Sequence, residues 1–445
     1  MTSEIKQRIE QINNGQVPTG YKETEFGIFP CDWVTDKTFG DLFSFNGGLS
    51  KSREELSENG IEYLHYGDMH RSDFNIASLE QYSKLPKYDT KIKGDESFLM
   101  QDGDVAFLDA SEDLEGTSRS VLIDNPENKP FIAGLHIIYG KPRGKELSKY
   151  YKQYLTRPEY IKKQFKKLAS GFKVYGLNRN TITGIKCAYP KSTAEQEKIA
   201  EILMKWDKAI ELYNQQIEKL TLLKSSCIKK MFPQKGEKVP EWRFKGFSNA
   251  WEQRKVTELG KIYIGLVTTM TAHYTDEGTL LIRNSDIKDG RFEFGEKPIF
   301  LEKSFAMANE SRMHQIGDVI TVHTGDVGTS AVISENEDKS IGFATIVTRP
   351  NKTIIDPSYL CTFLNTERHK KWAVAISTGD GRTNYNLGDY FELVVPVPSI
   401  KEQKQIAMFI ENLNNLITLH QRKVEIIIKQ RKALQQYLLN GIVRV

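Results

Sequence analysis

The chain contains two copies of one pattern, and this repeat limits its possible folds more than any other feature. Residues 190–200 read PKSTAEQEKIA, and residues 398–407 read PSIKEQKQIA. Each copy begins a long run of regularly spaced apolar residues with no proline or glycine inside it. A repeat of this length predicts two large, similar domains, each followed by a long helix.

The repeat also extends upstream of the two helices, where matching residues are separated by sequence that differs freely. Two copies of this kind are expected to share a backbone framework, while the side chains on their surfaces differ. The residues up to position 14 resemble the end of a third long helix, although this short match could also arise by chance. If the match holds, the order along the chain is helix end, domain, helix, domain, helix. The matches are Gly103-Asp104-Val105 with Gly317-Asp318-Val319, Gly116-Thr117-Ser118 with Gly328-Thr329-Ser330, Gly60 and Asp68 with Gly278 and Asp286, Trp33 with Trp251, and Asn14-Gly15 with Asn440-Gly441.

Apolar residues in both long runs recur in steps of seven, which is the heptad pattern of a coiled coil. Each helix is expected to be about 38 residues and roughly 57 Å long. Because a lone helix would leave its narrow apolar stripe in water, we expect the two to pack antiparallel on each other. Lys224 and Arg431 hold equivalent seam positions, and each either extends its charge to solvent or forms a polar layer that fixes register. The central seam residues are Trp206, Ile210, Tyr213, Ile217 and Leu220, with Leu413, Ile417, His420, Val424 and Ile427.

The two domains mix short strand-like runs with turns and helices, so the predicted fold class is α+β. It comprises two repeated α/β domains separated by two long helices, packed as an antiparallel coiled coil in a pseudo-twofold cyclic arrangement. Strands are expected at residues 61–66, 105–109, 121–124, 132–139, 280–283, 319–323, 331–334 and 343–348, and shorter helices at 148–168 and 357–376. The expected boundaries are an N-terminal helix at 1–14, a first domain at 15–190, a central helix at 191–235, a second domain at 236–398 and a C-terminal helix at 399–445.

Composition excludes several protein classes. Apolar residues make up 39% and aromatic residues 10% of the chain, which is too much for a disordered protein. The four cysteines are scattered and form no CxxC pair, so they indicate neither a disulfide framework nor a metal site. There is no leader-like apolar segment and no membrane-length stretch, and we expect a cytoplasmic protein. The net charge of +4 alone says little about nucleic acid.

No catalytic motif occurs in both copies of the repeat. Asp356-Pro357-Ser358-Tyr359 is one letter from the Asp-Pro-Pro-Tyr motif of amino-methyltransferases, but Asp followed by Pro also begins many helices. The first copy has Ser148-Lys149-Tyr150-Tyr151 there, and no glycine-rich loop for S-adenosylmethionine precedes either. His65 and His70 belong to no HExxH or zinc-ligand pattern. We therefore expect no catalytic residue, metal or cofactor in this chain.

Taken together, these motifs resemble the specificity subunit of type I restriction–modification enzymes, and the resemblance covers essentially the whole chain. Two Glu-Gln helix starts, each followed by a seven-step seam, make it specific. The motifs are Pro190, Glu195, Gln196 and Ile199, then Pro398, Glu402, Gln403 and Ile406, the paired Gly-Asp-Val turns, and Gly246-Phe247-Ser248-Asn249-Ala250-Trp251-Glu252.

The resemblance implies a non-enzymatic DNA-recognition protein. Each domain would be a target recognition domain that recognises one half of a bipartite, asymmetric target in duplex DNA. The helices would be conserved spacer regions that set the gap between the halves and dock two modification subunits. Those partners would carry S-adenosylmethionine and transfer the methyl group. Two restriction subunits, which use ATP and Mg²⁺, are the further partners that the family implies.

The family gives no fixed positions for base contacts, so the candidates are groups of suitable chemistry on loop-like segments. Arginine and lysine can recognise guanine and asparagine can recognise adenine, although most such side chains contact phosphate instead. In the first domain they are Lys51, Arg53, His70, Arg71, Lys173, Tyr175, Asn178 and Arg179. In the second they are Arg283, Asn284, Lys288, Arg291, His323, Arg382, Asn384 and Tyr385.

Two other functional classes are the alternatives. The first is a stand-alone DNA methyltransferase or nuclease, which the purified chain would reveal by transferring a labelled methyl group. The second is a scaffold protein that does not bind DNA. Phosphate contacts make affinity fall steeply with salt, so a reconstituted complex whose affinity ignored ionic strength would favour the scaffold.

Overall fold

The computed structural model describes residues 2–71, 76–78, 85–89, 97–169, 171, 175–234, 236–377 and 384–445. The chain forms two compact units. The first contains residues 1–213 with 423–445, and the second contains residues 214–422. Each unit therefore holds one domain together with part of both long helices. The domain boundaries given above stay predictions.

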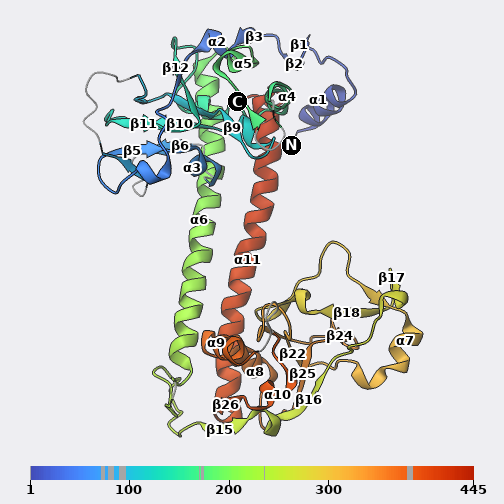
Figure 1. The fold of residues 1–445 in the computed structure, drawn as a ribbon. Helices are drawn as coiled ribbons and strands as arrows, with labels where there is room; N and C mark the ends of the chain where they lie inside the picture. The colour runs from blue at the N-terminus through green and yellow to red at the C-terminus, as the bar shows by residue number, and fades with distance from the viewer. Residues whose placement is uncertain are drawn as a thin grey trace. The chain divides into compact units, whose positions relative to one another are not determined.

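The two long helices are continuous. Helix α6 (Thr193–Met231) has 39 residues and α11 (Ile400–Leu439) has 40, and Figure 1 shows α6 in green and α11 in red without a break. Their seam residues are buried or half-buried, whereas most of the other positions are exposed. In the first unit Lys423 lies over the ring of Tyr213 at 4.8 Å. Arg431 pairs with Asp207 at 2.9 Å, so α11 runs antiparallel to α6, as the heptads predict.

The domain of the first unit is an α+β fold with one main sheet, whose strand order is β4-β12-β8-β10-β6, and a three-stranded sheet, β11-β5-β7. Its strands are β1 (Tyr21–Thr24), β2 (Gly27–Pro30), β3 (Trp33–Thr38), β4 (Phe43–Gly47), β5 (Ile61–Leu64), β6 (Ile76–Ser78), β7 (Lys87–Tyr88), β8 (Val105–Leu108), β9 (Ala110–Ser111), β10 (Ser120–Asp124), β11 (Phe131–Ala133), β12 (Ile137–Pro142), β13 (Tyr175–Gly176) and β14 (Lys186–Pro190). Its helices are α1 (Ser3–Asn13), α2 (Phe39–Leu42), α3 (Tyr66–Arg71), α4 (Glu159–Leu168) and α5 (Arg179–Thr183), with 3-10 turns η1 (Arg53–Glu55), η2 (Gly116–Ser118) and η3 (Tyr150–Tyr154).

The domain of the second unit has a main sheet of order β16-β25-β22-β23 and a smaller sheet, β17-β21-β18-β24. Its strands are β15 (Glu252–Lys255), β16 (Gly260–Ile264), β17 (Tyr274–Thr275), β18 (Thr279–Arg283), β19 (Ile287–Lys288), β20 (Arg291–Phe292), β21 (Phe300–Leu301), β22 (Val319–Thr321), β23 (Ser330–Val332), β24 (Ile341–Phe343), β25 (Ile346–Pro350) and β26 (Val394–Val397). Its helices are α7 (Lys303–Ala308), α8 (Pro357–Leu364), α9 (Glu367–Ile376) and α10 (Leu387–Phe391), with 3-10 turns η4 (Val256–Glu258), η5 (Thr271–His273), η6 (Asn284–Asp286) and η7 (Glu310–Arg312).

The two domains share one frame, as the sequence repeat predicts. Strands β4, β12, β8 and β10 correspond in order to β16, β25, β22 and β23. The Gly-Asp-Val turns also have the same conformation in both domains. Gly103 and Gly317 have φ of 83° and 93°, where a side chain would be strained. Asp104 and Asp318 each accept a hydrogen bond from the backbone N–H three residues earlier, at 2.8 and 2.9 Å.

Two predicted helices were wrong in extent because each is broken in the middle. Within residues 148–168 the chain forms η3 and then α4. Pro158 has no N–H to donate to the turn before it, so one continuous helix cannot form across it, and α4 begins directly after it. Residues 357–376 form α8 and α9. Thr366 caps α9 by accepting a hydrogen bond from the backbone of His369 at 3.2 Å, a start signal inside the expected helix.

Two predicted strands were also wrong in extent, while the other six are present with ends within two residues of those expected. Residues 132–139 divide between β11 and β12, and residues 343–348 divide between β24 and β25. His136 and Ala344 stand in the two breaks with φ of 60° and 49°. A residue with this left-handed backbone cannot continue a strand. Positive φ is uncommon in any residue other than glycine, so the sequence does not predict either break.

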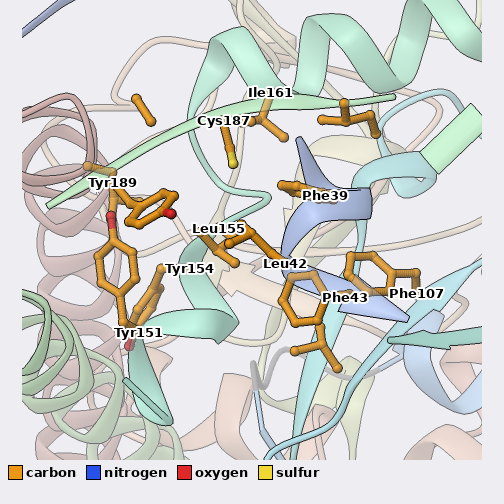
Figure 2. Packing of buried hydrophobic residues seen from close by; sticks show 14 of the residues in the cluster. Phe39, Leu42, Phe43, Phe107, Tyr151, Tyr154, Leu155, Ile161, Cys187 and Tyr189 are labelled. Carbon is orange, nitrogen blue, oxygen red and sulfur yellow. The ribbon is translucent and has the colours of Figure 1, made fainter. Parts of the chain in front are cut away.

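The core of the first domain continues into both long helices. Figure 2 shows part of this cluster, in which Phe39, Phe43 and Phe107 lie together and Tyr151 faces Tyr189. The same cluster includes apolar side chains of α6 and α11: Ile199, Ala200, Leu203, Leu438 and Leu439. The helices are therefore part of the domain's hydrophobic core rather than separate attachments.

The second domain is built in the same way around Trp251, which is 2% exposed and corresponds to Trp33 in the first domain. Phe232, which directly follows α6, packs edge-on against Trp251 with ring centroids 6.1 Å apart. The cluster extends to Ile406 and Ile410 of α11. Each Trp thus lies where one long helix ends and the other begins.

The N-terminal helix completes the first unit, as the third helix end in the sequence predicts. Arg8 of α1 donates a hydrogen bond to the backbone oxygen of Ile442 at 2.8 Å. Its guanidinium lies over the ring of Tyr21 at 5.3 Å, and the Tyr21 hydroxyl donates to the oxygen of Gly441 at 2.6 Å. Helix α1 therefore adjoins the end of α11, which is the predicted cyclic arrangement.

Acid is expected to destabilise the second unit through two buried histidines. Burial lowers the pKa of His314 and of His369 to about 4, against about 6.5 in an unfolded chain. Both are neutral when folded, so their stabilising contribution is complete above pH 6.5 and is lost as the pH falls through 4. Each contributes about 1.4 kcal/mol per pH unit in that range. Urea unfolding midpoints at pH 7 and pH 5 measure the loss, which should be about half as large in a His369→Phe variant. An equal loss in the variant contradicts the assignment to His369.

Candidate DNA-binding surfaces and helix junctions

The glutamine of the first Glu-Gln start joins α6 to the first domain. The Gln196 amide nitrogen donates to the backbone oxygens of Glu146 and Pro190, both at 2.8 Å. Its amide oxygen accepts from the backbone N–H of Ser148 at 2.7 Å. The side chain is fully buried, so these three bonds hold the helix start at one position on the domain.

The second Glu-Gln start repeats this junction. The Gln403 amide nitrogen donates to the backbone oxygens of Ile354 at 3.0 Å and Pro398 at 2.8 Å. Its amide oxygen accepts from the backbone N–H of Asp356 at 2.7 Å. Glutamine suits this position in both copies because its amide nitrogen can donate two hydrogen bonds while its amide oxygen accepts a third.

The glutamate of each pair binds an arginine from the segment that follows the other long helix. In the first unit Arg444, after α11, pairs with Glu195 at 2.5 Å and with Asp32 at 2.8 Å. In the second unit Arg243, after α6, holds Glu402 with two bonds of 2.7 and 2.8 Å. Each helix start is therefore tied to the end of its partner helix.

The two charged seam positions have different partners. Arg431 forms its ion pair with Asp207 across the seam, and Asp207 also accepts a hydrogen bond from the Tyr154 hydroxyl at 3.1 Å. Lys224 instead pairs with Asp289, in the turn between β19 and β20, at 2.9 Å. Arg431 is thus a polar contact between the helices, whereas Lys224 joins its helix to the second domain.

Several candidates in the first domain have intramolecular partners. Lys51 pairs with Glu55 at 2.8 Å, and Arg53 pairs with Asp68 at 2.9 Å while half of its side chain stays exposed. Asn178 caps α5, since its side chain accepts from the backbone N–H of the third residue on, at 3.0 Å. Arg179 begins that helix and is exposed.

Of the remaining first-domain candidates, His70 and Tyr175 lie in one loop cluster with Ser111 and Gly116. His70 packs edge-on against Tyr66 with ring centroids 6.2 Å apart. Tyr175 in β13 pairs with Ser111 in β9. Arg71 is the last residue of α3, and only its backbone is described. Lys173 lies outside the described residues.

Three candidates of the second domain converge. The Asn284 amide oxygen accepts from the backbone N–H of His323 at 2.8 Å, and Thr324 donates to the Asn384 side chain at 2.9 Å. Thr324 also bonds to the His323 ring at 2.7 Å. Arg382 lies outside the described residues.

The other candidates of the second domain form ion pairs within the chain or are at least partly buried. Arg283 holds Asp286 with bonds of 2.8 and 3.0 Å, and Arg291 pairs with Glu293. Lys288 is half-buried in β19. Tyr385 was a wrong prediction, because its side chain is fully buried among His369, Trp372 and Tyr390. Its segment resembles a surface loop in sequence, but the aromatic partners come from distant positions.

Sequence reasoning missed a second loop cluster, made of Tyr66, Asp109 and His136. The His136 ring bonds to the Asp109 carboxylate at 2.9 Å, and the backbone N–H of Asp109 donates to the oxygen of His136 at 3.1 Å. The Tyr66 ring meets the imidazole edge-on at 5.2 Å. Counting from the Gly-Asp-Val turns aligns Asp109 with the candidate His323, so the repeat itself contained the signal.

The methyltransferase-like tetrad is a helix start, as predicted. Asp356 accepts hydrogen bonds from the backbone N–H groups of Ser358 and Tyr359 at 3.0 and 3.1 Å. Within the described ranges, no group of three or more His, Cys, Asp or Glu side chains could hold a metal ion. None of the helices in the described part of the chain is long and apolar enough to span a membrane.

Comparison with known proteins agrees with this architecture. Residues 30–222 and 249–429 match the type I restriction modification DNA specificity domain. The chain is 23% identical over 435 residues to the putative type I restriction enzyme MjaX specificity subunit of Methanocaldococcus jannaschii, covering 96% of this chain and 97% of that one. It is 23% identical over 448 residues to the MjaVIII specificity subunit of the same organism, with the same coverage.

Solved structures share the fold. The type I restriction–modification S subunit of M. genitalium aligns with a TM-score of 0.57 at 14% identity, over 92% of this chain and 96% of that chain. A chain from a structure on complex assembly and conformational transition of the type I R-M system aligns with a TM-score of 0.55 at 15% identity, over 96% and 100%. Because the family match covers most of the chain in two copies, this protein belongs to the type I restriction–modification DNA specificity family, as a non-catalytic specificity subunit.

Proposed function

We propose that this chain recognises a bipartite, asymmetric sequence in duplex DNA, with one domain on each half. The observation that carries the proposal is the shared frame with unlike loops. Four strands of each main sheet correspond in order, yet the loops that leave them carry Asp109 and His136 in one domain and His323 and Ala344 in the other. Two identical surfaces would suit a symmetric target, whereas two unlike surfaces suit two different half-sites.

The long helices are proposed to set the number of base pairs between the half-sites and to dock two modification subunits, which carry S-adenosylmethionine. Restriction subunits, with ATP and Mg²⁺, would bind as additional partners in the cytoplasm. Support comes from the duplicated junctions at Gln196 and Gln403, which fix each domain in the same way at the start of a long helix, so that the two helices present equivalent outer faces. Leu212 and Leu419 hold equivalent positions outside the seam and are 47% and 60% exposed, as a docking surface requires.

DNA contact is proposed for the sequence candidates that the structure leaves at least partly exposed. Most of them would bind phosphate and position the domain, because phosphate contacts outnumber base contacts in such complexes. Arg71, Lys173 and Arg382 stay candidates on sequence grounds alone. The partly exposed candidates are Lys51, Arg53, His70, Tyr175, Asn178, Arg179, Arg283, Asn284, Lys288, Arg291, His323 and Asn384.

Exchanging the second domain tests the proposal. Residues 236–398 would be replaced by the matching segment of a specificity subunit with a different target, and the hybrid would be expressed with its modification partner. Sequencing of methylated adenines in the host DNA should show one new half-site and one unchanged half-site, because each domain has its own core. A change in both half-sites, or in neither, would contradict separate recognition by the two domains.

A further inference from the structure

The two domains place a cluster of three positions at the same point of their shared frame. Positions 66, 109 and 136 of the first domain correspond to 284, 323 and 344 of the second. The first pair stands two residues before the equivalent aspartates, each of which holds an arginine. The second pair follows β8 and β22 at the same distance from the Gly-Asp-Val turns. The third pair occupies the two left-handed breaks, with φ of 60° and 49°.

In the first domain the cluster presents a histidine supported by a carboxylate. Asp109 fixes the Nδ1 side of the His136 ring at 2.9 Å, and Tyr66 packs edge-on against the same ring at 5.2 Å. Nevertheless, 44% of the His136 side chain and 33% of the Asp109 side chain are exposed. The Nε2 atom of His136 has no partner among the described residues, so the ring is held in place with one polar edge free.

In the second domain the histidine stands at the neighbouring position of the same cluster. Thr324 fixes the Nδ1 side of the His323 ring at 2.7 Å, and the Asn284 amide accepts from the His323 backbone at 2.8 Å. The Asn284 amide also donates to the backbone oxygen of Ala344 at 3.2 Å, which links all three positions. Within the described part of the chain, Nε2 of His323 has no partner either. Asn284 is therefore a support, and His323 carries the free polar edge.

This arrangement differs from that of a structural histidine in the same domain. His369 is 1% exposed, and both of its ring nitrogens have partners, the Leu364 oxygen at 2.6 Å and the Tyr385 hydroxyl at 3.2 Å. His314 is also 1% exposed; its Nδ1 bonds to Ser340 and its Nε2 is buried without a partner in the described part of the chain, so neither of these two histidines can reach a group outside the chain. His136 and His323 are instead oriented through one nitrogen and leave the other for a hydrogen-bonding partner outside the chain.

We propose that these two clusters determine base specificity. His136, oriented by Asp109 and Tyr66, contacts base edges of one half-site, and His323, oriented by Thr324 and Asn284, contacts those of the other. The Asp109 carboxylate, whose side chain is 33% exposed, adds an acceptor, which suits the N4 amino group of cytosine in the major groove. The inference rests on the proposed function and names the side chains that carry it. The histidine stands at different positions of the cluster in the two domains. Each domain therefore presents a different hydrogen-bonding pattern on the same backbone framework.

Two substitutions in the first cluster test the proposal in the complete complex with its modification partner. His136→Asn removes the imidazole and keeps a residue that tolerates a positive φ, while Asp109→Asn keeps the shape and removes the charge. Each should lower discrimination at one or two base pairs of the first half-site by about tenfold or more. The second half-site should stay as it was. Sequencing of methylated adenines, with methylation rates on oligonucleotides that carry single base changes, gives the measurement.

The matched variant in the second domain is His323→Asn, which should relax only the other half-site. Lys129→Ala, at an exposed turn where Lys129 pairs with Glu127, is the neutral control. Thermal unfolding separates recognition from folding, because a purely structural role would lower the unfolding temperature and leave the base preference unchanged. If His136→Asn lowers the unfolding temperature, the test of base recognition rests on Asp109→Asn, because that variant keeps His136 at the left-handed position.

The outcomes separate this inference from the proposed function. A parent complex that methylates no bipartite sequence would overturn the proposed function itself. A parent complex with a bipartite target, whose half-site preferences survive both first-cluster substitutions unchanged, would overturn only the inference about the clusters.

Discussion

Replacing Glu402 by alanine is expected to lower the free energy of unfolding by about 3–5 kcal/mol, the usual effect of removing one partner of a buried ion pair. The Glu402 side chain is 1% exposed and that of Arg243 is 12% exposed. Without the carboxylate, the Arg243 guanidinium stays buried with its charge uncompensated. One of its nitrogens, Nη1, already lacks a partner among the described residues. Urea unfolding followed by tryptophan fluorescence measures the change, since Trp251 lies in the same core.

The equivalent substitution in the first unit gives a matched comparison. Arg444 is 36% exposed and keeps Asp32 as a second partner when Glu195 is removed. Glu195→Ala should therefore have a clearly smaller effect, about 1 kcal/mol, the range of partly exposed pairs. Equal losses for the two variants would show that burial does not control the strength of these pairs. A double variant, Arg243→Met with Glu402→Leu, should recover most of the loss, because it removes the stranded charge.

Replacing Gln403 by alanine is expected to destabilise the second unit and to loosen the domain on its helix. The substitution leaves one buried backbone N–H and two backbone oxygens without this partner, and each buried unsatisfied group costs about 1–3 kcal/mol. The total loss is then on the order of 3 kcal/mol or more. In the complex, methylation should tolerate targets whose half-sites are one base pair closer or farther apart. Unfolding midpoints and methylation of a series of spacer lengths give the two measurements.

Two controls sharpen the Gln403 prediction. Gln403→Glu keeps the acceptor for the Asp356 backbone but buries a carboxylate against the oxygens of Ile354 and Pro398, so it should destabilise the unit at least as much as alanine. Gln196→Ala removes the equivalent three bonds in the first unit and should give a similar relaxation of spacing. Destabilised variants that still accept a single spacer length would show that the junction maintains stability without fixing the orientation of the domain.

The parts of this fold that depend on local periodicity were predictable from the sequence. The seven-step seams gave two long helices and their antiparallel packing, since a heptad stripe can be buried only against another stripe. Asp356 followed by Pro357 gave the start of α8 for the same reason, because a helix cap needs only its nearest neighbours. The repeat added the correspondence of the two main sheets.

Features that depend on distant partners were not predictable. Nothing local marks Tyr385 as a core residue, because His369 and Trp372 reach it only in the folded domain. The pairing of Arg444 with Glu195 joins residues 249 positions apart. The cluster at Asp109 and His136 was missed because these two residues, 27 positions apart, meet only in the folded domain. Its left-handed histidine is a property of the backbone rather than of the sequence.

The first unit is built from two separate segments of the chain, and this affects when it can fold during protein synthesis. Residues 1–213 leave the ribosome early, but the unit also needs residues 423–445, which supply Leu438 to its core and Arg444 to its helix junction. At about 5–20 residues per second, translation of the intervening unit takes on the order of ten seconds or more. The domain that is made first is therefore completed last. Until then, its unfinished apolar surface is open to chaperones and proteases.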